Sequence, residues 1–332
     1  MGAVREFMDH HYLHFNSREV VAAARAWEAH LAAGGRMLVT LAGAMSTARI
    51  GRILSRMIRE NKVHAICCTG ANLEEDVFNL LAANEYEIID DWRALSADDE
   101  KALYDRGFNR VTDTCIPETV MRHLEERLLA RWKKASAEGE RRFPSEMLFD
   151  VLGDPTLAEH YQIPKSDSWM LAAKDEGIPV YTPGWEDSTT GNMFAAACFR
   201  GDLPDHGCVK TGTEQLASLM KWYIQNSGYR GENKPPEGHP SVGFFQVGGG
   251  IAGDFAICAV PTMVQDLKME RVPYWGYFAQ ISDAVTSYGG YSGAVPNEKI
   301  TWGKLEVDTP KFMIQSDASI VAPLIFGYVL GD

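Results

Sequence analysis

Short apolar runs alternate with amphipathic segments along the first part of the chain. The runs RMLVTL at 36–41 and HAICCTG at 64–70 have the length and composition of buried strands. Residues 46–61, between them, predict a helix, and LEEDVFNLLAA after the second run begins another. Buried apolar strands separated by amphipathic helices predict an α/β fold, with a parallel sheet covered by helices on both faces.

A helix is also predicted ahead of the first strand. Residues 17–33 are rich in alanine and place apolar side chains at helical spacing. Ser17 is the expected N-cap, and Val20 and Val21 open the buried face. The pair of glycines after residue 33 should end this helix.

The rest of the chain continues the alternation. Residues 118–150 are mainly charged and predict helices, and IPVYTPG at 178–184 predicts a further strand. The stretch at 226–241 is rich in glycine, proline and charge, which is typical of a loop, and VGFFQV at 242–247 predicts another strand. No change of composition marks a domain boundary at that loop, so we expect an excursion from a single domain.

Composition limits the classes of partner. The 332 residues include 45 acidic and 32 basic side chains, giving a formal charge of −13, which argues against a nucleic-acid partner and is compatible with a cationic substrate. The six cysteines form no C-x-x-C pair and most of them lie in apolar runs, which is typical of reduced core thiols in a cytoplasmic protein. No basic-then-apolar leader opens the chain, and the apolar stretch at 320–330 is too short to cross a bilayer. We therefore expect a cytoplasmic protein without a membrane partner.

The segment VGFFQVGGGIAGD satisfies the pattern G-x-G-x-x-G directly after a predicted strand. Gly248, Gly250 and Gly253 would let the backbone approach a pyrophosphate at the start of a helix. A tight strand-to-helix turn without a ligand has the same pattern, so both interpretations stay open.

Two further turns follow predicted strands. In CCTGANLEED at 67–76, the carboxylates Glu74, Glu75 and Asp76 either stabilise a helix N-terminus or include one that binds ribose hydroxyls. Asp187, in GWEDSTTGN, has the same two interpretations. Ligands of doubly wound sheets bind beyond the carboxyl ends of the strands, so three such turns that converged would form a site.

The loop SYGGYSGAVPNEKITWGKLEVD at 287–308 leads into Trp302, Gly303 and Lys304, and an alternating strand is predicted after them. Lys304 is either an ordinary lysine at a strand edge or a nucleophile, whose amine must lose its charge before it attacks a carbonyl or imine carbon. Trp302 could desolvate it and offer a cation–π face to a substrate ammonium, and Glu298 could pair with that ammonium.

The histidines near the N-terminus are weak metal candidates. His10 and His14 have i, i+4 spacing on a possible helix, but neither a cysteine nor a carboxylate partner accompanies them. We predict no metal site.

Taken in order, these segments resemble the deoxyhypusine synthase family. The similarity runs from about Arg36 to Leu330 through five motifs: TGANLEED, WEDSTTGN, VGGGIAGD, SGAVPNEKITWGK and SDASIVAPL. The resemblance implies a Rossmann-like, doubly wound fold in which residues 34–332 form a single NAD-binding domain. In the family an N-terminal extension covers the active-site entrance of a neighbouring subunit, and by the resemblance we expect it to be shortened here to a helical segment at 1–33.

The resemblance also implies a homotetramer with NAD at dimer interfaces, and a transfer reaction. Spermidine is oxidised by NAD beside its secondary amine, and the catalytic lysine captures the aminobutyl group as an imine (a Schiff base) while 1,3-diaminopropane leaves. An acceptor amine then displaces the lysine, and the retained NADH reduces the new imine. Lys304 matches the catalytic lysine, and Glu298 and Trp302 match substrate contacts. The positions that match NAD contacts are Thr69, Gly70, Glu75, Asp187, Gly249, Asp317 and Ala318.

The chain departs from the family's pattern around the substrate. Asn192 stands where the family has an aspartate that binds a substrate amine, Asp254 replaces a histidine, and Tyr291 replaces an aspartate. Because these positions contact the polyamine, their exchange should change which amine is bound. The other replacements are Cys258 for an asparagine, Tyr288 for an aspartate, and Ala-Gly-Ala at 42–44 for Thr-Ser-Asn.

The first hypothesis is an NAD-dependent enzyme that transfers an aminoalkyl group through Lys304. Its acceptor is either a protein lysine, as in deoxyhypusine synthesis, or a small diamine, as in homospermidine synthesis. The rebuilt pocket and the short N-terminus favour the small amine slightly. A catalytically silent NAD-binding scaffold subunit is a second hypothesis, against which the retained Glu-x-x-x-Trp-Gly-Lys context argues. A plain dehydrogenase would explain the glycines and leave the lysine loop without a role.

Overall fold

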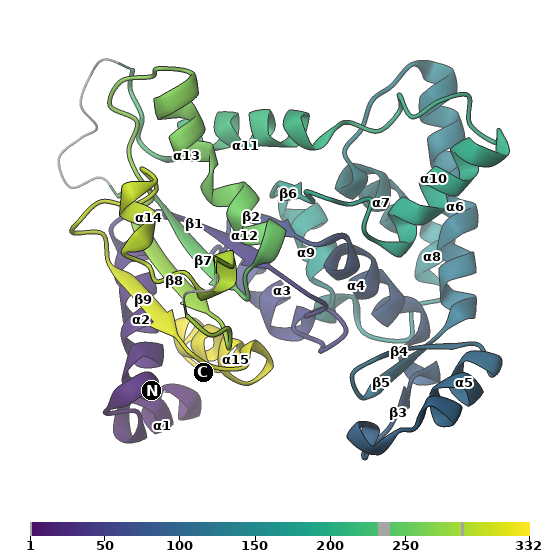
Figure 1. Cartoon of the computed structure of the whole chain (residues 1–332), viewed down its shortest axis with the longest axis horizontal. Coiled ribbons are helices and arrows are strands. Elements are labelled where there is room, and N and C mark those ends of the chain that lie inside the picture. Colours follow the sequence, from purple (N-terminus) through teal and green to yellow (C-terminus); the bar gives the residue numbers. More distant parts are fainter. Residues whose placement is uncertain (1, 232–239, 287–288) are drawn as a thin grey trace.

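The main sheet has six strands, all parallel. The computed structural model describes residues 2–231, 240–286 and 289–332. The order across the sheet is β6-β2-β1-β7-β8-β9, so the chain builds outward from β1 in one direction and then from β7 in the other (Figure 1). This order is that of a doubly wound Rossmann-like sheet, which confirms the predicted fold class. The strands are β1 (Arg36–Leu41), β2 (Ala65–Cys68), β6 (Val180–Tyr181), β7 (Val242–Val247), β8 (Tyr277–Ile281) and β9 (Lys311–Ile314).

The strands are apolar throughout because both faces of the sheet are covered. In β1, Val39 and Leu41 enter the core on one face, whereas Leu38 enters the core on the other. The helices of the first face are α2 (Phe15–Ala32), α3 (Gly51–Arg59), α9 (Trp169–Glu176) and α15 (Ala318–Leu330). The helices of the second face are α11 (Gly212–Asn226), α12 (Gly250–Ile257) and α13 (Ala259–Pro261), after which a π-helical turn spans Thr262–Asp266.

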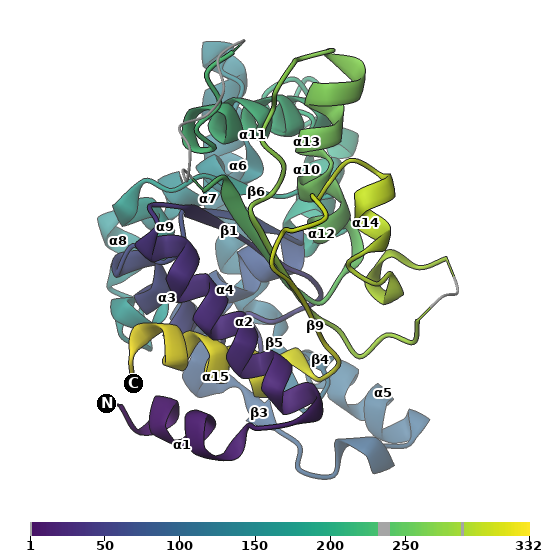
Figure 2. The ribbon, with the colours of Figure 1, turned by 90° about the vertical axis from the view of Figure 1, so that its left-hand side faces the viewer.

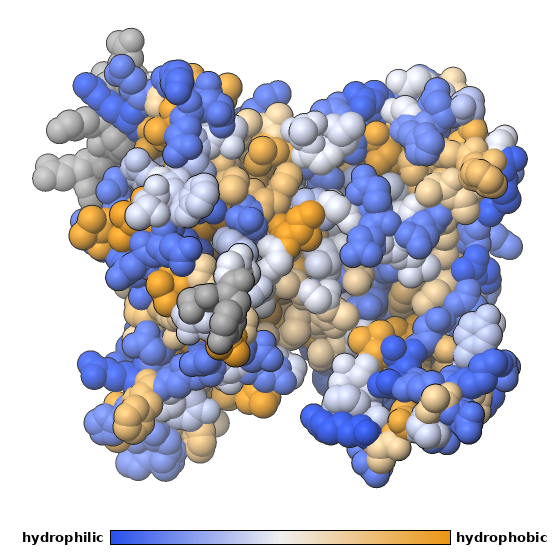
Figure 3. Space-filling model, in the orientation of Figure 1, coloured by the Kyte–Doolittle hydropathy of each residue, from blue (hydrophilic) through white to orange (hydrophobic). Residues whose placement is uncertain are grey.

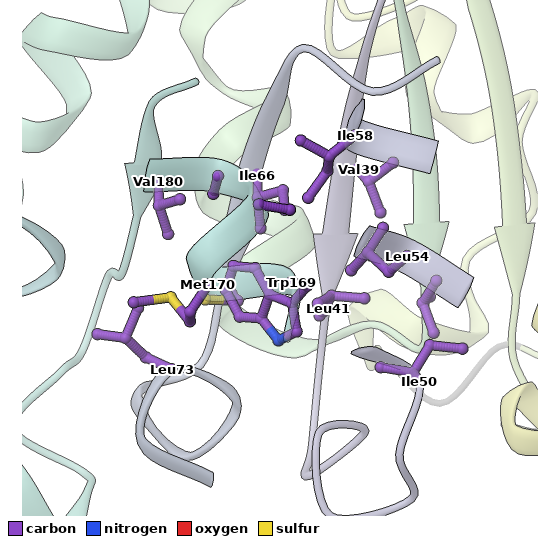
Figure 4. Packing of buried hydrophobic residues seen from close by; sticks show 14 of the residues in the cluster. Val39, Leu41, Ile50, Leu54, Ile58, Ile66, Leu73, Trp169, Met170 and Val180 are labelled. Atoms are coloured by element: carbon purple, nitrogen blue, oxygen red, sulfur yellow. The ribbon is translucent and has the colours of Figure 1, made fainter. Parts of the chain in front are cut away.

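Large side chains fill the core of the first face. Trp27 of α2 is fully buried, with its ring 4.7 Å from that of Phe245 and 5.9 Å from that of Phe326. Figure 4 shows another part of this core, where Trp169 of α9 and Leu54 of α3 lie beside β1. Burial of a tryptophan of this kind contributes several kcal/mol to stability, of the order of 3–5.

A second group of elements extends away from the main sheet (Figure 1). It contains a small antiparallel sheet in the order β3-β5-β4, which the sequence pattern did not predict. Its strands are β3 (Glu87–Ile88), β4 (Phe108–Val111) and β5 (Thr114–Pro117). Its helices are α4 (Gly70–Ala82), α5 (Ala97–Asp105), α6 (Glu118–Glu138), α7 (Pro144–Leu152), α8 (Pro155–Ala158) and α10 (Thr189–Arg200).

The two ends of the chain lie side by side (Figures 1 and 2). Helix α1 (Ala3–His11) packs against α15, and the Arg5 amide donates to the Asp332 carbonyl at 3.0 Å. Figure 3 shows a face on which polar and apolar side chains are mixed, with a hollow between the part built on the main sheet and the second group of elements. Among the residues described, no helix combines the length and apolar composition that a bilayer-spanning helix needs.

Several predicted boundaries were wrong. The helix expected over 46–61 begins only at Gly51, because the backbone at Arg49 has a positive φ of 61°. Ser17 lies inside the first turn of α2 and donates to the carbonyl of His14, which occupies the N-cap position. Helix α1 ends at His11, so His10 and His14 do not share a helix.

The strand expected directly after Lys304 starts only at Lys311, since turns occupy the residues between them. The predicted loop at 226–241 begins where α11 ends, and residues 232–239 lie outside the described residues.

Candidate functional site

Four helices begin just beyond the carboxyl ends of parallel strands. Their N-cap residues are Thr69 after β2, Ser188 after β6, Gly249 after β7 and Asp317 after β9. Helix N-termini present unpaired N–H groups and a partial positive charge, so this edge of the sheet favours an anionic ligand. The three turns that were predicted to converge therefore lie at the carboxyl edge of the main sheet, and the turn at Asp317 lies there too.

The glycine-rich turn lies at the point where the strand order reverses, between β1 and β7. Gly248 has a positive φ of 78°, and a Cβ there would lie 2.9 Å from that of Ala42 in the turn after β1. A Cβ on Gly249 would lie 1.9 Å from Ser292 Oγ, which accepts a hydrogen bond from the Gly250 amide at 3.2 Å. The glycines are thus required for the close approach of three backbone segments at the crevice where doubly wound sheets bind ligands.

The carboxylates of the TGANLEED turn have different partners. Glu74 accepts from the amides of Thr189 and Thr190 at 2.9 and 2.7 Å and so helps to cap α10. Asp76 accepts from the Ser168 hydroxyl and from the Met170 amide, and so ties α4 to α9.

Glu75 is the exception among these carboxylates. Its side chain is buried, and its Oε2 has no hydrogen-bond partner among the described residues. Burial raises the pKa of Glu75 to about 7. A buried carboxylate oxygen without a partner, in a residue that lines a cavity shared with Asn192, fits a ligand that offers hydroxyl donors, such as a ribose.

The other positions matched to NAD contacts lie along the same edge. Gly70 is the first residue of α4, and a Cβ there would lie 2.5 Å from that of Ser188. Asp187 is exposed immediately before the N-cap of α10, and Ala318 is the first residue of α15. The helix N-termini, the close glycine turns and the free carboxylate oxygen together fit a dinucleotide.

A cavity of about 650 Å³ opens beside α12, under the loop that leads to Lys304. Two of its sides come from α12 and the π-helical turn, and the others come from the loop and from α14 (Glu298–Thr301). Its described lining residues are Asp254, Cys258, Pro261, Thr262, Gln265, Asp266, Gly289, Gly290, Tyr291, Ala294, Glu298, Lys299, Trp302 and Lys304.

Lys304 is buried in the wall of this cavity, at 7% exposure. Its Nζ donates to Asp254 Oδ1 at 3.2 Å. The same nitrogen lies 5.5 Å from the ring centroid of Tyr291 and 5.9 Å from that of Trp302. The structure therefore places three residues that the sequence singled out, Asp254, Tyr291 and Trp302, around the amine of Lys304.

The mouth of the cavity is acidic. Glu298 and Asp266 are exposed, and the side chain of Asp254 is half exposed. Trp302 keeps 63% of its surface exposed at the same opening, so its ring shields Lys304 on one side only. Burial raises the pKa of the Cys258 thiol, which lies 3.9 Å from Asp254 Oδ1.

Sequence analysis missed Lys299, the second buried lysine of the cavity. It is only 3% exposed, and burial, assisted by the charge on Lys304, lowers its pKa to about 8. Nothing in its surroundings in the sequence, Glu298 before and Ile300 after, indicates that the lysine rather than its neighbour points inward.

Two buried glutamine side chains of the main sheet hold the loop before Lys304 in place. The hydroxyl of Tyr291 donates to Gln246 Oε1 at 2.8 Å, and Gln280 Nε2 donates to the Ser292 carbonyl at 2.6 Å. These glutamines of β7 and β8 are fully buried, and no sequence motif pointed to them. They fix the aromatic ring against which both lysines lie.

Two of the positions at which this chain departs from the family's pattern are not among the described residues that line this cavity. Asn192 is on α10, donates to the Glu186 carbonyl at 2.9 Å and lines a different cavity, beside Glu74 and Glu75. A single chain therefore does not bring Asn192 to Lys304. Tyr288 lies outside the described residues.

Comparisons with known proteins point to one family and to its fold. The family model of deoxyhypusine synthase matches residues 7–329. A deoxyhypusine synthase-like protein of Chlorobaculum parvum is 26% identical over 295 residues, covering 88% of this chain and 75% of that protein. A protein of the same description from a Nostoc species is 27% identical over 342 residues, covering 99% and 82%. A solved chain from Entamoeba histolytica, provisionally assigned as a deoxyhypusine synthase, superposes with a TM-score of 0.57 at 11% identity, covering 95% of this chain and 88% of that one, which supports the fold.

Proposed function

The chain belongs to the deoxyhypusine synthase family, and on that premise we propose that it is an NAD-dependent enzyme that transfers an aminoalkyl group as an imine on Lys304. One observation carries the proposal. The amine of Lys304 is buried in the wall of a cavity and bonded to a carboxylate, while further carboxylates lie at the mouth. The carboxylates at the mouth attract a cationic substrate, and a buried amine beside it can attack the substrate's imine carbon.

Asp254 is positioned to exchange a proton with Lys304. Lysine attacks only after it has lost a proton, and Asp254 Oδ1 is already 3.2 Å from its Nζ. We assign Asp254 as the acceptor of that proton and as the donor that returns it when the imine is displaced. Since the carboxylate is half exposed, it can also exchange the proton with solvent.

Glu298 and Trp302 bind the substrate at the mouth. The carboxylate of Glu298 attracts an ammonium, and the exposed indole of Trp302 offers it a cation–π contact. The ring of Tyr291, whose hydroxyl is held by Gln246, forms another wall of the cavity beside Lys304.

NAD, when bound, supplies the acceptor and later the donor of hydride. The Gly248–Gly250 turn and the N-termini of α4 and α12 would hold its phosphates, and Glu75 would accept from ribose hydroxyls. Asp187, Asp317 and Ala318 complete the proposed contacts at the same edge of the sheet.

We propose a cytoplasmic homotetramer, as the family implies. Asn192 could approach a lysine cavity only from a second copy of the chain, since it lines a different cavity in its own. We further propose that residues 34–332 form the NAD-binding domain and that 1–33 is a helical segment appended to it.

A transfer assay tests the proposed function. Purified protein is incubated with NAD and a panel of secondary amines beginning with spermidine, labelled in the butyl arm, together with putrescine or a hypusine-precursor protein. Label should move to one of the two acceptors only when NAD is present, and Lys304→Arg should abolish the transfer. Label in the protein alone would assign deoxyhypusine synthesis, and label in a new polyamine would assign a polyamine synthase. The absence of transfer from every donor to either acceptor would contradict the proposal.

A further inference from the structure

Lys299, a buried lining residue of the lysine cavity, carries a positive charge on which the carboxylates of Glu298 and Asp254 act without contacting it. Lys299 Nζ donates to Gln280 Oε1 and to the Ala294 carbonyl, both at 3.4 Å, and both acceptors are neutral. In the part of the chain that the structure describes, no carboxylate forms an ion pair with this nitrogen, unlike Lys304, which pairs with Asp254. A buried ammonium normally pairs with an anion, because neutral acceptors at such distances do not offset its desolvation.

Two aromatic rings add to the surroundings of Lys299 without neutralising it. Its Nζ lies 5.0 Å from the ring centroid of Phe278 and 4.8 Å from that of Tyr291. The pKa of about 8 means that Lys299 still carries its proton at neutral pH. The charge therefore remains and acts on whatever enters the cavity.

The charges of the cavity are ordered from its mouth to its buried end. The carboxylates Glu298, Asp266 and Asp254 are exposed or half exposed, whereas the two ammonium groups are buried. The hydroxyl of Tyr291, whose ring lies beside Lys299, donates to Gln246. An ammonium at the buried end would be repelled by Lys299, and a carboxylate there would be attracted.

We propose that the buried end of this cavity binds a carboxylate through Lys299, so that the alkyl group carried on Lys304 ends in a carboxylate while the ammonium groups of the substrate lie at the mouth. The inference rests on the proposed imine chemistry of Lys304 and changes the group that it carries from an aminoalkyl to a carboxyalkyl group. The substrate class is then secondary amines with one arm that ends in a carboxylate. The distances allow it. Both nitrogens lie near the centroid of the Tyr291 ring, at 4.8 and 5.5 Å, so they are at most about 10 Å apart. A four-carbon chain with one charge-assisted hydrogen bond of about 2.8 Å spans up to about 9 Å, which covers most of this range.

Aldehyde trapping tests the charge preference without NAD and without a donor amine. The amine of Lys304 attacks the aldehyde carbon, water leaves as the imine forms, and borohydride adds hydride to that carbon to give a stable secondary amine. The probes are 4-oxobutanoate and butanal, which have the same chain length and differ in the terminal carboxylate. Peptide mapping then counts only the label on Lys304.

We expect 4-oxobutanoate to label Lys304 at least about tenfold faster than butanal, because a charge-assisted hydrogen bond favours the carboxylate. Lys299→Met, which keeps the length and the apolar stem, should bring this ratio close to one. Lys133→Met, at an exposed lysine of α6, is the matched control and should keep the ratio of the unmodified protein.

The other outcomes overturn the inference in different ways. If Lys299 only holds the loop through Ala294, its replacement slows both probes together and leaves the ratio unchanged. If it pairs with a phosphate of the cofactor, its replacement weakens NAD binding, again at an unchanged ratio. If neither aldehyde labels Lys304 in any variant, the imine chemistry itself fails, and the inference fails with it.

Discussion

Replacing Lys299 by methionine should stabilise the protein at neutral pH, and the gain should vanish as the pH rises. The pKa of Lys299 falls from the ordinary 10.5 to about 8 in the fold, because of burial and then of the charge on Lys304. A pKa difference of about 2.5 units between the folded and the unfolded chain, at about 1.36 kcal/mol per unit, means that the buried charge lowers the unfolding free energy by roughly 3 kcal/mol. Between about pH 8 and 10.5 the unfolded chain holds this proton and the folded chain does not, so stability rises with pH in that window.

Urea unfolding of the unmodified protein, Lys299→Met and Lys133→Met, from about pH 7 to 10, measures the effect. The free energy of unfolding of Lys299→Met should exceed that of the unmodified protein most near pH 7, by up to about 3 kcal/mol. This difference should shrink by about 2 kcal/mol or more near pH 10. The exposed Lys133 should show no such change. A difference that stays constant with pH, or a variant that is less stable throughout, would refute the reasoning and make Lys299 an ordinary packing residue.

Three further replacements separate cofactor binding, chemistry and folding. Glu75→Gln should raise the Kd of NAD about tenfold in a calorimetric titration, since the free carboxylate oxygen is lost. Glu74→Gln should lower the melting temperature instead, because Glu74 caps α10. Equal effects of the two variants on the Kd of NAD would contradict the assignment. Asp254→Asn should lower kcat roughly 10²-fold or more, the usual contribution of a positioned acid–base group, with little change in melting temperature, and a kcat within twofold of the unmodified protein would exclude that role. Trp27→Ala should reduce the unfolding free energy by about 3–5 kcal/mol, and a loss below about 1 kcal/mol would show that the core beneath the sheet is formed differently.

The strands of the main sheet could be predicted because they are buried on both faces. RMLVTL and VGFFQV became β1 and β7 with the predicted bounds, since a continuous apolar run has no alternative to the interior. The small sheet was missed because its strands span only two to four residues and carry polar side chains, as in Phe108–Val111. Boundaries failed where a local backbone feature decided them, such as the positive φ of Arg49.

The candidate site could be predicted only in part, for a related reason. Lys304, Glu298 and Trp302 stand in a distinctive stretch of sequence, and Asp254 follows the glycine turn by four residues. Lys299 and Gln280 have no such context, because their roles come from the packing of a short helix on a strand that is far away in the sequence. The choice among the three carboxylates of TGANLEED likewise needed their partners, which left only Glu75 with a free oxygen.

The measurement that tests the central claim most directly is reductive trapping of the reaction intermediate. The protein and Lys299→Met are each incubated with NAD and spermidine, reduced with borohydride and mapped by mass spectrometry, with Lys304→Arg as the control. The account predicts an aminobutyl adduct on Lys304 that requires NAD and is absent from Lys304→Arg. This adduct should be weak in the unmodified protein, because the charge of Lys299 opposes its ammonium end, and more abundant in Lys299→Met. No adduct on Lys304 in either active form, or an adduct on Lys299 in its place, would contradict the claim that Lys304 carries the transferred group.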